Sequence, residues 1–399
     1  MAATLGLGTD NNWATKENSL LAYNSVNNNF KPLPFDFTRA TDATRVNKLG
    51  LIETVSNGQP RIDFLDNING NFLIEPQRAN LVTYSEDFSH SSWVKLGAGT
   101  GSAAIVTSNY AISPDGTLNA SRLQCDLNSG GSSSSNQSLI YDVYSSSGNQ
   151  TISIYVKSNN GQNQTIYFAN TQTSGDTIIV TPEWKRFTFS HSTSTYVAAV
   201  GLRGRSGGAI DDTADILIYA AQAEQGSYAS SYIPTAGSAV TRNQEVPIRN
   251  GIGSVINSAE GVLFGEVNFG QIDTVARYIC VSSGSATNRA IFGIEANQSI
   301  LRYYFTTGSS LVVNANQSLG DISIFNKIAI KWKVNDFAMW LNGVEVATDT
   351  SGAVPSAGVF TSLRFTSGGT AQPFFGKVKE LKLYNTALTD SELQTLTTI

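Results

Sequence analysis

The sequence predicts an all-β protein in which two antiparallel β-sandwiches follow an irregular N-terminal segment. Charged residues make up 14% of the 399 residues, against about 25% in an average globular protein. The polar remainder is Ser, Thr, Asn and Gly, and the chain carries 15 Tyr and 19 Phe. This composition is typical of short β-strands joined by tight turns and excludes an all-helical protein. At about 150 residues per domain, the length favours two or three domains.

The first region, residues 1–75, is rich in Asn and shows no periodic pattern. We interpret it as an extended arm that folds on a partner, with a set of short strands as the alternative. Trp13, Tyr23 and Phe30 are scattered along it and have no evident core of their own. We therefore expect this segment to attach the protein to its partner through these three aromatic residues.

The second region, residues 76–245, reads as a β-sandwich. In the run from Thr151 to Lys157, apolar Ile152, Ile154 and Val156 alternate with polar residues, including Thr151, Ser153 and Lys157. A period of two marks a half-buried strand. Similar short runs follow, interrupted by Ser-, Asn- and Gly-rich turns, as in sandwich folds.

The third region, residues 246–399, reads as a second sandwich that follows a linker at 238–253. Its clearest strand is expected over 327–334, with Ile328, Ile330, Trp332 and Val334 toward the core and Lys327, Ala329, Lys331 and Lys333 toward solvent. Asn342-Gly343 predicts a hairpin turn, because both residues tolerate positive φ. Thr389-Asp-Ser-Glu392 is a capping box that opens a short helix to about Thr397.

Several motifs in the first two regions occur together in one order. They are Phe35–Val46, Gly50–Glu53, Pro60–Asp63, Leu73–Leu81, Tyr84–Phe88 with Trp93, Thr151–Lys157, Glu183-Trp184, Ala221–Gly226, Ser231–Thr235 and Ala239–Arg242. This set resembles a module of tailed-bacteriophage virion proteins, commonly found in fibres and other surface appendages. Such modules are similar to the jelly rolls of carbohydrate-binding modules. The resemblance implies a jelly roll for 76–245 and makes a free arm less favoured for 35–75.

Residues 260–399 resemble the concanavalin A-like lectin and laminin-G sandwich, through the stretch Phe375–Leu393 and the hairpin at Trp340–Gly343. Glycosidases of that fold carry a Glu-x-Asp-x-x-Glu strand, and no Glu here is followed by Asp at the second position. The two histidines, His90 and His191, lie far apart in the sequence. We therefore expect a binding or structural protein without catalytic residues, not an enzyme.

Two groups of residues are candidate ligand sites. Trp93, Trp184 and Trp340 are candidates for stacking on sugar rings, whose apolar faces pack on aromatic planes; packing anchors are the alternative. Asp211, Asp212 and Asp215 lie close together at a loop-to-strand junction and are candidates for Ca²⁺. Turn aspartates that cap backbone N–H groups are the alternative. No other cofactor is expected.

Charge and segment composition bound the remaining functions. The net charge of −5 leaves no basic surplus for binding nucleic acid. Cys125 and Cys280 are too few for a zinc site or a disulfide scaffold. No signal peptide and no apolar run of about 20 residues is present, so we expect synthesis in a bacterial host cytoplasm without membrane insertion.

With the phage resemblance, these observations predict a virion surface protein: a fibre, head-fibre or capsid decoration protein that binds host-surface glycans. We expect it to form a homotrimer and to contact other virion proteins. A virion-associated polysaccharide-degrading enzyme and a bacterial adhesin or prophage remnant are the alternatives.

Overall fold

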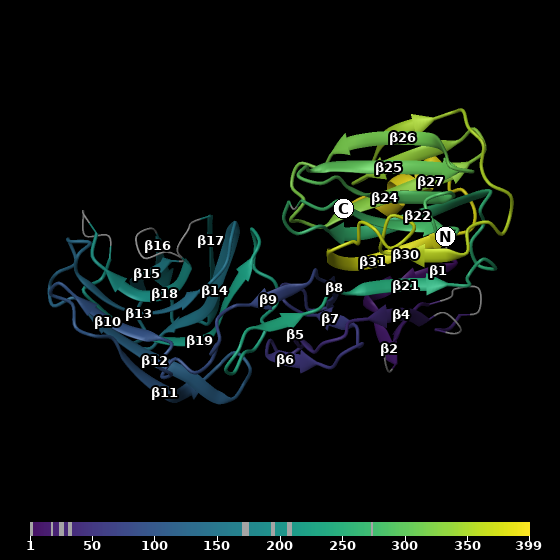
Figure 1. Ribbon diagram of the computed structural model, residues 1–399. Helices are drawn as coiled ribbons and strands as arrows, with labels where there is room; N and C mark the ends of the chain where they lie inside the picture. The colour runs from purple at the N-terminus through teal and green to yellow at the C-terminus, as the bar shows by residue number, and fades with distance from the viewer. Residues whose placement is uncertain are drawn as a thin grey trace. The chain divides into compact units, whose positions relative to one another are not determined.

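The computed structural model describes residues 3–16, 19–23, 28–30, 34–169, 175–192, 196–205, 210–272 and 274–399. Over these residues almost all of the regular secondary structure is β-strand, and the paired strands are antiparallel (Figure 1). The all-β prediction is confirmed. No helix in the described part of the chain has the length and apolar character needed to cross a membrane.

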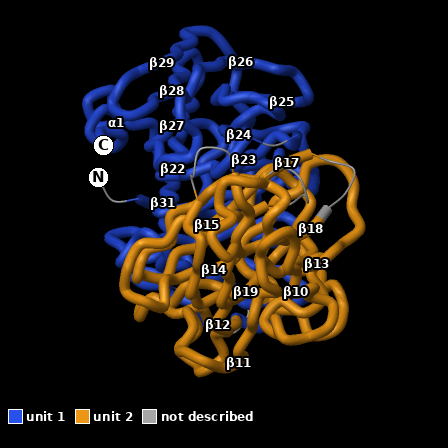
Figure 2. The backbone as a smooth tube through the Cα atoms, turned by 90° about the vertical axis from the view of Figure 1, so that its left-hand side faces the viewer, with its two compact units in different colours: residues 1–42, 55–76, 244–399 blue, residues 43–54, 77–243 orange. Residues whose placement is uncertain are grey.

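The chain divides into two compact units and passes between them four times (Figure 2). Unit 1 comprises residues 1–42, 55–76 and 244–399, and unit 2 comprises residues 43–54 and 77–243. This division differs from the three consecutive segments 1–75, 76–245 and 246–399 expected from the sequence. The strand Leu5–Leu7 pairs with Gly376–Tyr384 and the strand Pro34–Thr38 pairs with Val246–Asn250, and such long-range pairing leaves no local pattern in the sequence.

Unit 1 is built from two large sheets. In chain order, the strands described for it are β1 (Leu5–Leu7), β2 (Ala14–Lys16), β3 (Ser19–Leu21), β4 (Pro34–Thr38), β7 (Arg61–Asp63), β8 (Asn71–Ile74), β21 (Val246–Asn250), β22 (Glu260–Asn268), β23 (Arg277–Ser282), β24 (Arg289–Ile294), β25 (Ile300–Thr307), β26 (Ser310–Ser318), β27 (Asn326–Lys333), β28 (Phe337–Leu341), β29 (Val344–Asp349), β30 (Ser362–Arg364) and β31 (Gly376–Tyr384). One sheet has the order β29-β28-β27-β22-β31-β8-β7, with β1 paired to β31. The other has the order β2-β3-β4-β21-β30-β23-β24-β25-β26.

The N-terminal region is part of the core of unit 1 and not a free arm. Its apolar side chains pack in one cluster with side chains of both sheets: Leu5, Leu7, Leu20, Ala22, Phe35 and Phe37. Trp13 packs against the same cluster, and its indole N–H donates to the Gly70 carbonyl at 3.3 Å. Tyr23 pairs through its backbone with Gly6, and its ring lies 5.4 Å from that of Phe30. The expectation that Trp13, Tyr23 and Phe30 have no core to pack against is therefore wrong for Trp13, which packs against the core of unit 1.

The predicted strand at 327–334 is β27, and its core face agrees with the alternation. Ile328, Ile330 and Trp332 are buried, but Val334 is 54% exposed because β27 ends at Lys333. Two residues of the face expected in solvent, Ala329 and Lys331, are also buried. They are covered because helix α1 (Asp390–Thr397) contacts β27.

The short-range signals of the third region are confirmed. Asn342 and Gly343 have φ of 50° and 84° between β28 and β29. At α1, the Thr389 side chain accepts from the Glu392 backbone while the Glu392 side chain accepts from Thr389. The turn and the capping box each depend on residues no more than four positions apart. Both can therefore be predicted from the sequence.

Unit 2 contains two five-stranded sheets in its described residues. The strands are β5 (Ala43–Val46), β6 (Ile52–Val55, whose last residue is assigned to unit 1), β9 (Arg78–Asn80), β10 (Val94–Ala98), β11 (Ile105–Ile112), β12 (Leu118–Asp126), β13 (Gln137–Tyr144), β14 (Asn149–Ser158), β15 (Gln164–Ala169), β16 (Asp176–Val180), β17 (Lys185–Ser192), β18 (Tyr196–Arg203), β19 (Thr213–Gln225) and β20 (Val240–Arg242). The sheets have the orders β10-β13-β18-β15-β16 and β11-β12-β19-β14-β17; β20 pairs with β9 and β5 with β6. Ile152, Ile154 and Val156 of β14 lie in the core, as their alternation predicts.

A buried ionic network lies in unit 1, near the residues at which the chain passes between units. Glu245 accepts from Arg39 Nη1 at 2.8 Å, from Arg61 Nε and Nη2 at 2.7 and 2.6 Å, and from the Glu75 backbone N–H at 2.8 Å. Arg61 also pairs with Glu75 at 2.7 Å. Burial acts to lower the pKa of Arg61, but the two carboxylates outweigh it and raise this pKa. Arg39, Arg61 and Glu75 belong to the motifs at 35–81. Those motifs therefore supply side chains that bind Glu245 and join distant chain segments within unit 1.

Candidate functional site

Trp93 is a core residue and not a surface platform. Its side chain is 1% exposed, its indole N–H donates to the Tyr84 carbonyl at 2.9 Å, and its ring lies 4.9 Å from Phe88. A buried indole with its N–H satisfied is a packing anchor. The candidate sugar contact at Trp93 is therefore wrong.

Trp340 is also covered. It is 6% exposed and lies on β28 in a cluster with Leu388 and Leu393, the latter on α1. The helix that the capping box predicts thus packs over the tryptophan of the predicted hairpin. A sugar could not reach the Trp340 ring without displacing α1.

Trp184 is the candidate that reaches the surface. It precedes β17, is half-buried, and packs, as Tyr155 does, against a buried cluster that contains Tyr219 and Tyr232. Its indole N–H donates to the Ile112 carbonyl at 3.2 Å. This bond joins Trp184, which comes just before the edge strand β17, to the last residue of β11, the opposite edge strand of the same sheet.

Strand register identifies the other side chains of this face. Ile154, Val156 and Ile218 point into the core, so the residues between them point outward. Tyr155 pairs in register with Tyr219 on β19 and with Arg186 on β17. Two residues farther along, Leu217 pairs with both Arg122 and Lys157. We call the half-buried members of this surface, with Trp184, the Trp184 face: Arg122, Tyr155, Lys157, Trp184, Arg186 and Asp215.

The Trp184 face carries a planar ion pair. Arg122 binds Asp215 through two bonds, Nε to Oδ1 at 2.8 Å and Nη2 to Oδ2 at 2.6 Å, and Asn159 donates to the same Oδ1 at 3.0 Å. The hydrogen bond from Arg122 lowers the pKa of Asp215. The ring of Tyr110, which is 44% exposed, lies 5.1 Å from the Arg122 guanidinium. The guanidinium of Arg122 and the carboxylate of Asp215 are thus fixed hydrogen-bonding groups beside the Tyr110 ring.

Next to this face, Tyr219 joins two carboxylates. Its hydroxyl lies 3.2 Å from Glu86 Oε1 and 3.0 Å from Asp115 Oδ2. Tyr232 donates to the same Glu86 oxygen at 2.8 Å. Tyr219 precedes Ala220, which has φ of 55° in a register shift between β14 and β19. A bulge of this kind re-aims the neighbouring side chain.

Asp115 is held ionised. Burial acts to raise its pKa, but hydrogen bonds from Ser113, Thr117 and Asn119 outweigh burial and lower the pKa to about 2. A carboxylate that is ionised at all ordinary pH values cannot serve as a general acid. Asp115 could therefore act only as a base or nucleophile, and glycoside hydrolysis at this pair would need Glu86 as the general acid.

The three aspartates proposed for calcium do not converge. Asp211 accepts from the Thr165 N–H at 2.8 Å, Asp212 accepts from the Gly131 N–H at 2.9 Å, and Asp215 pairs with Arg122. No group of three or more His, Cys, Asp or Glu placed to hold a metal ion occurs in the described ranges. Two of these residues cap backbone groups, the alternative that turn chemistry offers.

Its residue type and its position near a loop identify Trp184 as a candidate in the sequence. They do not reveal which side chains lie beside it in the folded protein. Tyr155 alternates with the core residues of the run 151–157, so the sequence predicts that its side chain points away from the core. The register that places it beside Tyr219 and Arg186 joins residues 31 and 64 positions apart in the chain. Glu86 and Asp115 come from two further loops, and no local signal connects them.

Residues 267–394 match the concanavalin A-like lectin/glucanases superfamily. The matched residues all belong to unit 1. The match covers the strands from β23 to β31 and the start of α1. It agrees with the resemblance of residues 260–399 noted in the sequence. No curated protein matches the chain.

Among solved structures, this chain is similar to the carbohydrate-binding module CBM40 of the Ruminococcus gnavus IT-sialidase bound to α2,3-sialyllactose, with 18% identity, a TM-score of 0.31, and coverage of 36% of this chain and 85% of that chain. It is similar to domain 4 of an extracellular arabinanase from Geobacillus stearothermophilus, with 16% identity, a TM-score of 0.32, and coverage of 43% and 84%. It is also similar to the Trypanosoma rangeli sialidase, with 10% identity, a TM-score of 0.28, and coverage of 96% and 83%.

Proposed function

We propose that the protein binds glycans through the Trp184 face and acts as a non-enzymatic adhesion protein. The observation that carries this proposal is the geometry of the face, where the Trp184 and Tyr155 rings lie in one sheet surface with the Arg122–Asp215 pair. Aromatic planes suit the apolar faces of sugar rings, and fixed planar polar groups suit their hydroxyls. The concanavalin A-like match of residues 267–394 supports a lectin-like function for the chain.

We further propose that the adhesion protein stands on the surface of a tailed-bacteriophage virion, as a fibre, head-fibre or decoration protein. The ordered motifs over 35–93 and 231–242 support this setting, through their resemblance to a module of such particles. Host-surface glycans, other virion proteins and further copies of this chain, in a homotrimer, are its proposed partners. Repeated weak glycan contacts gain affinity when several copies are presented together.

A polysaccharide-degrading enzyme is the second candidate, and the Tyr219-bridged pair of Glu86 and Asp115 is the observation that favours it. Because the depressed pKa of Asp115 keeps this carboxyl ionised, such an enzyme would need Glu86 as its general acid. We prefer the non-enzymatic proposal because the aromatic and polar groups of the Trp184 face suit glycan binding without either carboxylate.

Incubation of the full chain with polysaccharides extracted from the bacterial host tests the proposed function. We expect retention of at least one polysaccharide by the immobilised protein and no release of new reducing ends. New reducing ends would favour the enzyme, and no retention at all would contradict glycan binding. Absence of the chain from purified virions by mass spectrometry would contradict the virion setting alone.

A further inference from the structure

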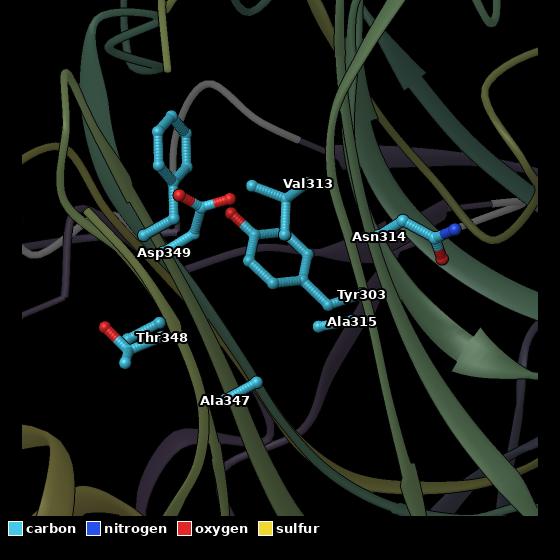
Figure 3. Close-up of a pocket in the computed structure, with 9 residues that line it drawn as sticks. Tyr303, Val313, Asn314, Ala315, Ala347, Thr348 and Asp349 are labelled. Carbon is cyan, nitrogen blue, oxygen red and sulfur yellow. The ribbon is translucent and has the colours of Figure 1, made fainter. Parts of the chain in front are cut away.

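A small cavity opens in unit 1 between the edge strands of its two sheets (Figure 3). β26 ends one sheet order and β29 ends the other, and no strand pairing joins them in the described residues. The cavity has a volume of about 100 Å³. Its inward-facing side chains, which we call the β26–β29 slot, are Tyr303, Val313, Ala315, Phe337, Ala347 and Asp349. This slot belongs to unit 1, whereas the proposed glycan site belongs to unit 2.

The slot has one carboxylate on an otherwise apolar and aromatic wall. Figure 3 shows the Asp349 carboxylate directed toward the Tyr303 hydroxyl, while the side chains of Asn314 and Thr348 point away. Asp349 Oδ1 accepts from the Ser351 N–H and hydroxyl, both at 2.9 Å. The nearby Lys331 ammonium pairs with Asp336 at 2.7 Å. Within the described chain no Lys or Arg is paired with Asp349, so a cation in the slot would meet an uncompensated negative charge.

The aromatic groups of the slot are fixed. The Tyr303 hydroxyl donates to the Lys331 carbonyl at 2.8 Å. Burial raises the pKa of Tyr303 well above its ordinary value, and the charges of Asp349 and Asp336 raise it further, so the phenol stays neutral. Phe337 lies directly opposite Asp349 in the strand register. Tyr303 and Phe337 are 1% and 0% exposed, so they form the closed inner wall of the slot, and the Asp349 carboxylate sets the sign of the ligand charge.

Size and charge together define the ligand class. The slot is large enough to admit a small group such as a substituted ammonium. An anion would be repelled by the Asp349 carboxylate. We propose that the β26–β29 slot binds a substituted ammonium group. A choline-type headgroup and the protonated amine of an amino sugar are two sources of this one chemistry.

Calorimetric or NMR titration of the full chain with choline, glucosamine and 3,3-dimethylbutanol tests the proposal. The last probe has the shape of choline without its charge. We expect an ammonium probe to bind with a dissociation constant of about 1 mM and the uncharged analogue to bind at least about tenfold more weakly. Tighter binding of choline would identify a methylated headgroup as the source, and tighter binding of glucosamine would identify an amino sugar.

Three variants complete the test. Asp349→Asn keeps the acceptor for Ser351 and removes the negative charge. Ala347→Leu fills the slot with a larger side chain. Each substitution is expected to lower the affinity for the ammonium probe at least about tenfold. Asp321→Asn is the matched control, because Asp321 Oδ1 accepts from the Ser323 N–H and hydroxyl in the same turn pattern, away from the slot. It is expected to bind as the parent chain does. Unchanged binding by Asp349→Asn, equal binding of the uncharged analogue, or no binding of either ammonium probe would overturn the proposal.

Discussion

Replacement of Glu245 by alanine is expected to lower the free energy of unfolding by about 3–5 kcal/mol, the cost of breaking a buried ion pair by removing one partner. The Glu245 side chain is 0% exposed and binds the guanidinium groups of Arg39 and Arg61, which are also 0% exposed. Its loss leaves two buried cations with less compensation and the Glu75 N–H without its acceptor. Urea unfolding followed by intrinsic fluorescence measures the effect.

Glu53→Ala is the matched control for Glu245→Ala. Glu53 also pairs with an arginine, Arg45, at 2.6 Å, but the two side chains are 36% and 27% exposed. Exposed pairs of this kind contribute about 0–1 kcal/mol. If Glu245→Ala were as mild as Glu53→Ala, the network would not be what stabilises the junction of chain segments in unit 1.

Deletion of residues 1–23 is expected to unfold unit 1. The deletion removes Leu5, Leu7 and Leu20 from the core, together with the pairing of β1 with β31 and of β3 with β4. Truncating a single buried Leu to Ala costs about 2–5 kcal/mol, so removing three of them with their backbone costs about as much as the whole stability of an ordinary domain, about 5–15 kcal/mol. Limited proteolysis should then cleave within residues 244–399 while residues 77–243 resist.

The same deletion separates two accounts of the N-terminal region. An attachment arm could be removed without disturbing the fold, which is the expectation that the aperiodic sequence supports. If the shortened chain resisted protease over residues 244–399 and melted as the full chain does, the region would be an accessory arm. Circular dichroism of the shortened chain gives a second measure of the strand content lost.

Local patterns predicted the elements of this fold well. The alternation at Ile152, Ile154 and Val156, the Asn342-Gly343 turn and the Thr389–Glu392 capping box each depend on residues within one strand or one turn, and each is present. The incorporation of residues 1–42 into unit 1 depends on pairings such as Leu5 with Leu383. Register across so many intervening residues is set by packing and has no local signature.

The candidate site was predictable to a smaller extent. Three tryptophans are sugar-binding candidates by residue type alone. Trp93 and Trp340 are buried, however, under segments whose position over them cannot be predicted from the sequence. Aromatic residues are equally suited to cores and to sugar-binding surfaces, so burial decides between the two. The partners of Trp184, above all Tyr155 and Arg122, come together only when β14, β19 and β12 are aligned.

The most direct test of glycan binding at the Trp184 face is a calorimetric titration of the full chain, before and after Trp184→Ala, with a polysaccharide that the protein retains. We expect the substitution to weaken binding at least about tenfold, a loss of about 1.4 kcal/mol. Phe325→Ala, which removes a half-buried ring in unit 1 near Lys379, is expected to leave the affinity unchanged. Equal affinities of the parent chain and Trp184→Ala would contradict the assignment of the glycan site to this face.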